Sequence, residues 1–154
     1  MHPKAEQVQK ALADAGVETE VRELPDSTRT AAEAAAAIGT TEAQIVKSLV
    51  FLCNDAMILA LVSGPNRVSL EKLGIVAGGQ IEQPNAKAVK ALTGFSVGGV
   101  PPVGHEDQPP TFIDEDLMAF DVVWAAGGTP HAVFPIRPSD LVAVTGGKVV
   151  DLKQ

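Results

Sequence analysis

The sequence has few aromatic residues, a single cysteine and no long apolar run. Five Phe, one Trp and no Tyr stand among its 154 residues, so the core must be built from Ala, Val, Leu and Ile. The lone cysteine, Cys53, excludes an internal disulfide and a cysteine metal cluster. No apolar run approaches the ~20 residues that cross a bilayer, and no basic-then-apolar leader opens the chain. These absences predict a cytoplasmic protein with no membrane contact.

Positive charge is also scarce. The formal net charge of −7 argues against extended binding along a nucleic-acid backbone, because such binding needs many Lys and Arg side chains. A ligand with one or two phosphates, or one end of an RNA, remains compatible with this charge, since an acidic protein can carry a local basic pocket. With 45% hydrophobic and 20% charged residues, the chain is predicted to form one globular domain over 1–154.

The apolar patterns predict an α+β fold with a mixed, mainly antiparallel sheet, because strands and short helices mix without a regular βαβ alternation. The expected helices span 3–15, 30–38, 41–44, 69–73, 85–92, 115–118 and 139–145, and the expected strands 17–24, 45–53, 56–63, 80–82, 111–114, 121–126 and 131–136. No glycine-rich fingerprint of a dinucleotide site or a P-loop follows a strand and opens a helix.

Lys47 is a charge at the entrance of an apolar strand. The runs 45–53 and 56–63 flank Asn54-Asp55, which predicts a hairpin buried on both faces over most of its length. A lysine in this position either snorkels to water or acts as a point charge on a phosphate or a carbonyl oxygen. The sequence alone leaves both readings open.

The stretch 95–104 places a glycine pair, Gly98-Gly99, just before the proline pair Pro101-Pro102. Adjacent glycines allow close approach to bare backbone, and the prolines hold the exit extended. Amides converging in such a turn suit an oxygen that carries or develops negative charge. The alternative is a purely structural turn, since Gly and Pro mark turns in general.

Other polar residues carry weaker signals. His131 follows the second glycine turn, 127–130, and either binds a substrate oxygen or packs at a strand start. The acidic cluster 114–116 is a candidate for acid–base work, although Asp114 equally suits a helix cap. Three dispersed His and no HExxH or CxxC pattern predict no metal site, and no cofactor is expected. No serine stands in a GxSxG context, and Cys53 suits an inert core thiol.

Four segments in order resemble the YbaK/ProX family, free-standing relatives of the editing domain inserted in bacterial prolyl-tRNA synthetases. These segments are Lys47-Ser48-Leu49-Val50-Phe51, Gly98-Gly99-Val100-Pro101-Pro102-Val103-Gly104, Thr111-Phe112-Ile113-Asp114 and Ala126-Gly127-Gly128 with Pro138-Ser139-Asp140-Leu141. The resemblance implies a sheet curled into a partly closed barrel and flanked by short helices. It also implies hydrolysis of the ester joining a wrong amino acid to tRNA, chiefly tRNA for proline.

The resemblance also implies roles for single residues. Lys47 matches a lysine that anchors the substrate, and Gly98 and Gly99 match a loop that orients the ester carbonyl and the water. The implied substrate-binding residues are Thr30, Ala126, Gly127, Gly128 and His131. Ala126 stands where the cysteine-editing branch has a serine, which favours Ala, Ser or Thr as the residue removed.

The implied partners are the acceptor end of an aminoacylated tRNA and prolyl-tRNA synthetase. Two other functions stay open on the residues alone. One is a non-catalytic module that binds an acceptor end or a synthetase. The other is a small-molecule hydrolase that uses Asp114 and Asp116.

Overall fold

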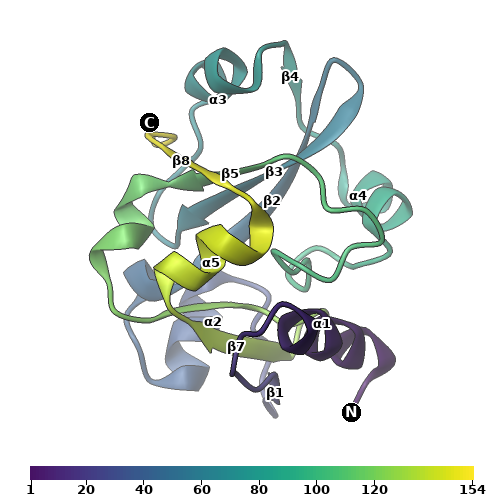
Figure 1. Ribbon diagram of the computed structural model, residues 1–154, viewed down its shortest axis with the longest axis vertical. Coiled ribbons are helices and arrows are strands. Elements are labelled where there is room, and N and C mark those ends of the chain that lie inside the picture. The colour runs from purple at the N-terminus through teal and green to yellow at the C-terminus, as the bar shows by residue number, and fades with distance from the viewer.

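The computed structural model describes residues 1–154 and contains two separate β-sheets with helices around them (Figure 1). The helices are α1 (Pro3–Asp14), α2 (Ala31–Ile38), α3 (Leu70–Ala77), α4 (Ala86–Thr93) and α5 (Pro138–Thr145), with 3₁₀ turns η1 (Glu42–Gln44) and η2 (Glu115–Ala119). The strands are β1 (Arg22–Glu23), β2 (Val46–Cys53), β3 (Ala56–Ser63), β4 (Ile81–Glu82), β5 (Thr111–Asp114), β6 (Val123–Ala126), β7 (Ala132–Ile136) and β8 (Lys148–Val150). No helix has the length and apolar character needed to cross a membrane.

The larger sheet has the strand order β4-β2-β3-β5-β8, and the smaller sheet has the order β1-β7-β6. The β2–β3, β2–β4, β1–β7 and β6–β7 pairs are antiparallel, whereas β3–β5 and β5–β8 are parallel. These pairings confirm the predicted α+β class with a mixed, mainly antiparallel arrangement.

The β2–β3 hairpin is formed as predicted, with Val46 opposite Ser63 and Cys53 opposite Ala56. Asn54 and Asp55 both have positive φ, at 48° and 68°, which suits the tight turn of a two-residue hairpin. Strand β3 is buried from Ile58 onward, while Lys47 to Leu49 of β2 are only half-buried.

Two apolar clusters cover the two faces of β3. Leu59 and Leu61 point into a cluster of 20 buried residues shared with α1, α5 and the smaller sheet. Ile58, Ala60 and Val62 point to the other face, where a cluster of nine buried residues includes Leu73 of α3. This alternation follows from the two-residue period of a strand. In Figure 1, α3 and β4 accordingly lie at one end of the molecule and α1 with β1 and β7 at the other.

The predicted barrel is wrong, because neither sheet closes or curls strongly. A single parallel bridge, Ile45 to Trp124, joins the two sheets. Between Val46 and Phe51, β2 pairs with β3 on one side and with no strand on the other, because β4 meets β2 only at Leu52 and Cys53. A cavity and the side chains around it lie where a strand would have to pair with β2 to close the sheet.

Several element boundaries also differ from expectation. Strand β1 is two residues long instead of spanning 17–24, and β8 was not expected. Helix α3 runs through Gly74 to Ala77, and Gly78 ends it in the left-handed conformation at φ 81°. Ser139 lies inside α5 and does not cap it, since Arg137 occupies the N-cap without a side-chain hydrogen bond.

Candidate active site

A cavity of about 460 Å³ lies at the open edge of β2, in the gap between the two sheets. Its walls come from the β2 edge, the first turn of α2, the loop before α4, the Gly98 turn and the smaller sheet. Most of the lining is small and apolar, including Ala31, Ala32, Ala34, Val46, Val50 and Val133. A volume of this size is in the usual range for a small-molecule site, and the apolar lining suits an aliphatic side chain.

Four of the eight predicted site residues line this cavity. They are Thr30, Lys47, Gly98 and Ala126. Thr30 comes from the N-cap of α2, Lys47 from β2, Gly98 from a turn and Ala126 from the end of β6. The tertiary structure thus brings together residues that lie far apart in the sequence.

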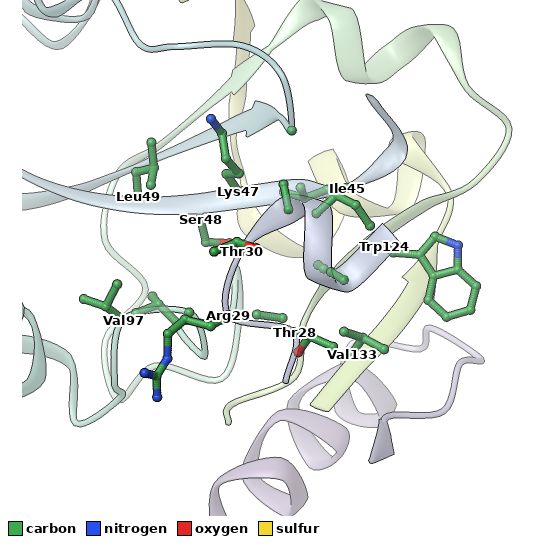
Figure 2. A pocket seen from close by; sticks show the side chains of 18 of the residues that line it. Thr28, Arg29, Thr30, Ile45, Lys47, Ser48, Leu49, Val97, Trp124 and Val133 are labelled. Atoms are coloured by element: carbon green, nitrogen blue, oxygen red, sulfur yellow. The ribbon is translucent and has the colours of Figure 1, made fainter. Parts of the chain in front are cut away.

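Lys47 is half-buried, and burial lowers the pKa of its ammonium group below the usual value. The Glu42 carboxylate opposes this shift and raises the pKa, while Arg67 lowers it. Figure 2 shows the Lys47 side chain leaving β2 on the side opposite to Ser48, which points toward Thr30. The ammonium donates a hydrogen bond to the main-chain carbonyl of Asn66.

The first turn of α2 contributes positive potential to the cavity. The Thr30 hydroxyl oxygen accepts a hydrogen bond from the Glu33 N–H at 3.1 Å and so caps the helix. Thr30, Ala31 and Ala32 line the cavity, so the N-terminal end of the helix dipole lies there. Arg29 adds a second cation to the lining, and Glu42 is the one acidic side chain there.

Gly98 and Gly99 differ in whether the backbone N–H group is already hydrogen-bonded within the chain. Gly98 has φ +90° and lines the cavity, and no acceptor within the chain bonds its N–H. Gly99 lies outside the lining, and its N–H donates to the Ser96 carbonyl oxygen at 2.9 Å. Of the glycine pair, Gly98 therefore keeps an amide available for a ligand.

The second glycine turn does not reach the cavity. A Cβ on Gly127 would lie 2.7 Å from Val21, and a Cβ on Gly128 would lie 2.6 Å from the Lys4 carbonyl oxygen, so both glycines allow close packing. His131 is exposed, and its N–H donates to the Thr129 hydroxyl oxygen at 3.2 Å. The structure thus leaves Gly127, Gly128 and His131 outside the lining, next to Ala126, which belongs to it.

Sequence reasoning missed several polar lining residues, among them Arg29, Ser48 and Trp124. Arg29 directly precedes Thr30, Ser48 directly follows Lys47, and Trp124 lies two residues before Ala126. The Ser48 hydroxyl oxygen is buried and has no hydrogen-bond partner. Its position next to Lys47 in the motif was the signal available in the sequence.

The acidic cluster does not line the cavity. Asp114 is fully buried and accepts a hydrogen bond from the Asp116 N–H, which confirms the predicted capping role. Asp116 forms an ion pair with Lys153 at 2.8 Å. These contacts argue against acid–base catalysis by Asp114 and Asp116. Cys53 is buried and free, as expected of a core thiol.

The cavity offers donors and cations but no nucleophile–base pair. Lys47, Arg29, the α2 terminus and the Gly98 amide can each stabilise negative charge on oxygen. No group of three or more His, Cys, Asp or Glu side chains is arranged to hold a metal ion. The lining therefore suits a ligand that carries or develops negative charge on an oxygen atom.

Comparison with known proteins agrees with this description. Residues 25–144 match the family described as the aminoacyl-tRNA editing domain. A solved structure described as a candidate trans-editing enzyme for prolyl-tRNA synthetase is 50% identical, with a TM-score of 0.94 over 100% of this chain and 99% of that one.

Two sequence relatives carry informative names. EbsC of Enterococcus faecalis, named as a candidate Cys-tRNA(Pro)/Cys-tRNA(Cys) deacylase, is 25% identical over 77% of this chain and 73% of its own length. The proline–tRNA ligase of Lactobacillus acidophilus is 31% identical over 57% of this chain, which corresponds to 16% of the ligase.

The chain belongs to the aminoacyl-tRNA editing domain family. Its activity is that of a deacylase, an enzyme that hydrolyses the ester bond of a mischarged tRNA.

Proposed function

We propose that the protein acts in trans in the cytoplasm on tRNA for proline that carries Ala, Ser or Thr. The observation that carries this proposal is the cavity of about 460 Å³, whose lining combines small apolar side chains with Lys47 and the Gly98 amide. The apolar part suits a small side chain, and the donors suit the ester. The Cys-tRNA named for EbsC is not carried over, because Ala126 replaces the serine of the cysteine-editing branch.

The proposed chemistry needs no protein nucleophile. Lys47 anchors the terminal phosphate or the ester oxygen as a point charge, and the Gly98 N–H stabilises the oxyanion that forms when water attacks the carbonyl. The neighbouring ribose hydroxyl of the tRNA assists the attack. One oxyanion donor typically contributes about 3 kcal/mol of transition-state stabilisation.

There is a physical reason for a separate site that removes wrong amino acids after the synthetase has attached them. A synthetase pocket rejects a residue that is smaller by one methylene by only about 1–3 kcal/mol, so errors persist unless another site removes them. Contact with the acceptor end alone also agrees with a net charge of −7, because two cations, Lys47 and Arg29, line the cavity. Prolyl-tRNA synthetase is the proposed protein partner.

The test is a deacylation panel of tRNA for proline charged with Ala, Ser, Thr or Cys, with the cognate Pro ester as control. The protein is expected to hydrolyse at least one of the Ala, Ser and Thr esters and to leave the Pro ester intact. Lys47→Met keeps the apolar stem and removes the charge, and it is expected to lower the rate at least about 100-fold. An unchanged circular dichroism spectrum and melting temperature would exclude unfolding as the cause.

Two results would contradict this proposal. Salt-sensitive tRNA binding without hydrolysis of any ester would replace the proposal with a non-catalytic binding module. Hydrolysis of the Cys ester alone would overturn the proposed specificity and leave the deacylase activity intact.

A further inference from the structure

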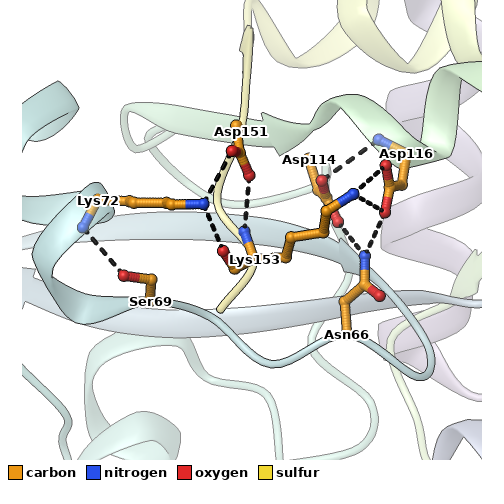
Figure 3. A network of polar contacts seen from close by, with 7 residues as sticks. All are labelled: Asn66, Ser69, Lys72, Asp114, Asp116, Asp151 and Lys153. Atoms are coloured by element: carbon orange, nitrogen blue, oxygen red, sulfur yellow. Dashed lines mark hydrogen bonds and ion pairs between the residues drawn. The ribbon is translucent and has the colours of Figure 1, made fainter.

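Asn66 connects Lys47 to a network of carboxylates outside the cavity. It lies in the turn between β3 and α3, and its main-chain carbonyl accepts a hydrogen bond from the Lys47 ammonium. Its side-chain amide donates to Asp114 Oδ2 at 2.7 Å and to Asp116 Oδ2 at 2.8 Å. Figure 3 shows the Asn66 side chain directed at both carboxylates.

The orientation of the Asn66 amide follows from its partners. Ionised carboxylates only accept hydrogen bonds, so the NH₂ group must face Asp114 and Asp116. Both of its protons are engaged, one by each carboxylate. The residue is thereby held at two points, and its main-chain carbonyl has a defined direction.

The carboxylates are themselves fixed. Asp114 is fully buried at the end of β5, and its second oxygen accepts from the Asp116 N–H at 3.3 Å. Lys153 donates to both oxygens of Asp116 at 2.8 Å. Lys72 holds the Lys153 carbonyl oxygen at 2.7 Å and pairs with Asp151 at 2.8 Å. The network therefore joins β5, η2, α3 and the C-terminal residues to the turn that contacts Lys47.

A lysine needs such a fixed contact in order to act at a defined place. Its side chain has about 2 kcal/mol of rotamer entropy, and its ammonium carries three donors. One donor is engaged by the Asn66 carbonyl, which leaves two for a ligand. The other lining cation, Arg29, has no hydrogen bond from its guanidinium to the rest of the chain.

We propose that Asn66 is a positioning residue for Lys47, held in place by Asp114 and Asp116. The inference rests on the proposed function, in which Lys47 contacts the substrate. It gives the acidic pair a role that needs no proton transfer. Because Asn66 lies outside the cavity lining, it acts on the reaction only through Lys47.

The test combines a direct view of the Lys47 ammonium with kinetics. In ¹⁵N-lysine-labelled protein, a held ammonium exchanges its protons slowly enough to give an Nζ signal, and Lys47→Met identifies which signal belongs to it. Asn66→Ala is expected to abolish or shift that signal. In the deacylation assay it is expected to lower kcat/KM about tenfold, because Lys47 is proposed to anchor the substrate.

Two further variants and one control variant extend this test. Asn66→Ser keeps one donor and is expected to restore part of kcat/KM and of the signal. Asp116→Ala removes one of the two amide contacts at a partly exposed position and is expected to give an intermediate effect. Lys10→Met removes an exposed ion pair with Asp14 and touches no member of the network, so it is the matched control with less than about a twofold change.

An Asn66→Ala protein with an unchanged Lys47 signal overturns the proposal, whatever its activity. The proposal also fails if Asn66→Ala leaves kcat/KM unchanged. If Asn66→Ala does not fold, Asp116→Ala and Asn66→Ser decide the question by the same two measurements. An inactive wild-type protein that still shows the Asn66-dependent signal would refute the proposed function and leave the contact between Asn66 and Lys47 established.

Discussion

Gly99 packs directly against the backbone of Thr129. A Cβ on Gly99 would lie 2.7 Å from the Thr129 carbonyl carbon and 2.8 Å from its Cα. The two glycine turns of the sequence, around 98–99 and 127–130, therefore meet backbone against backbone. This contact explains the second glycine of the pair by packing, whereas Gly98 faces the cavity.

Gly99→Ala is therefore expected to destabilise the protein. Neither backbone can yield easily, and overpacking of this kind costs about 1–3 kcal/mol in the free energy of unfolding. Urea denaturation monitored by circular dichroism measures the loss. Gly146→Ala is the comparison, because a Cβ there meets nothing within 4 Å and only the left-handed φ of 64° opposes it. Equal stability of Gly99→Ala and the wild type would contradict the packing argument.

Glu42→Gln is expected to change the pH dependence of deacylation. The Glu42 carboxylate raises the pKa of Lys47, so its removal lowers that pKa further. The Lys47 ammonium is then lost at a lower pH, and the alkaline decline of kcat/KM moves to lower pH with it. Initial rates are measured from pH 7 upward, after subtraction of the spontaneous hydrolysis of the ester. A shift toward higher pH would show that Glu42 acts on a group other than Lys47.

His105 is expected to make the folded state sensitive to mild acid. Its Nε2 lies 2.7 Å from the Pro101 carbonyl oxygen, which can only accept, so Nε2 carries the proton. Its Nδ1 is buried and has no partner, so the charged ring would leave a donor unpaired. Burial lowers the pKa of His105, while the hydrogen bond to Pro101 partly opposes this shift.

The direction of the pH effect follows from this pKa. Between the lowered folded pKa and the unfolded value of about 6.5, the unfolded chain binds more protons than the folded one. The stabilisation by neutral His105 is therefore complete above about pH 6.5 and is lost as the pH falls toward the folded pKa. Urea midpoints between pH 7.5 and 5 measure this loss. His105→Gln keeps a donor for Pro101 and is expected to flatten the slope, and an unchanged slope would assign the effect to other groups.

Ser48→Ala is expected to leave the protein as stable as the wild type or more stable. The Ser48 hydroxyl is buried without a partner, and an unsatisfied buried polar group costs about 1–3 kcal/mol. Its removal relieves that cost and creates only a small void. Thermal and urea unfolding test this, with Ser63→Ala as the control, because the Ser63 hydroxyl donates to the Ala43 carbonyl oxygen. Destabilisation of Ser48→Ala equal to that of Ser63→Ala would show that Ser48 has a partner in solution.

Local patterns determined much of the fold. The β2–β3 hairpin followed from two apolar runs around Asn54-Asp55, and α2, α3 and α4 begin after Thr30, Ser69 and Asn85, where the expected helices 30–38, 69–73 and 85–92 start. Those signals depend on residues close in the sequence, so no tertiary information was needed. The barrel failed for the opposite reason, since closure depends on whether a distant strand pairs with the open edge of β2.

The sequence by itself determined the family motifs, the hairpin that carries Lys47 and the absence of a nucleophile–base pair. The tertiary structure alone decided that Gly98 lines the cavity and that Gly99, Gly127 and Gly128 do not, because that depends on the backbone packed against each glycine. It also decided that His131 lies outside the lining and that Asn66 contacts Lys47. Asn66 is 19 residues from Lys47 and 48 from Asp114, and such contacts form only when strands, turn and C-terminal residues assemble around one core.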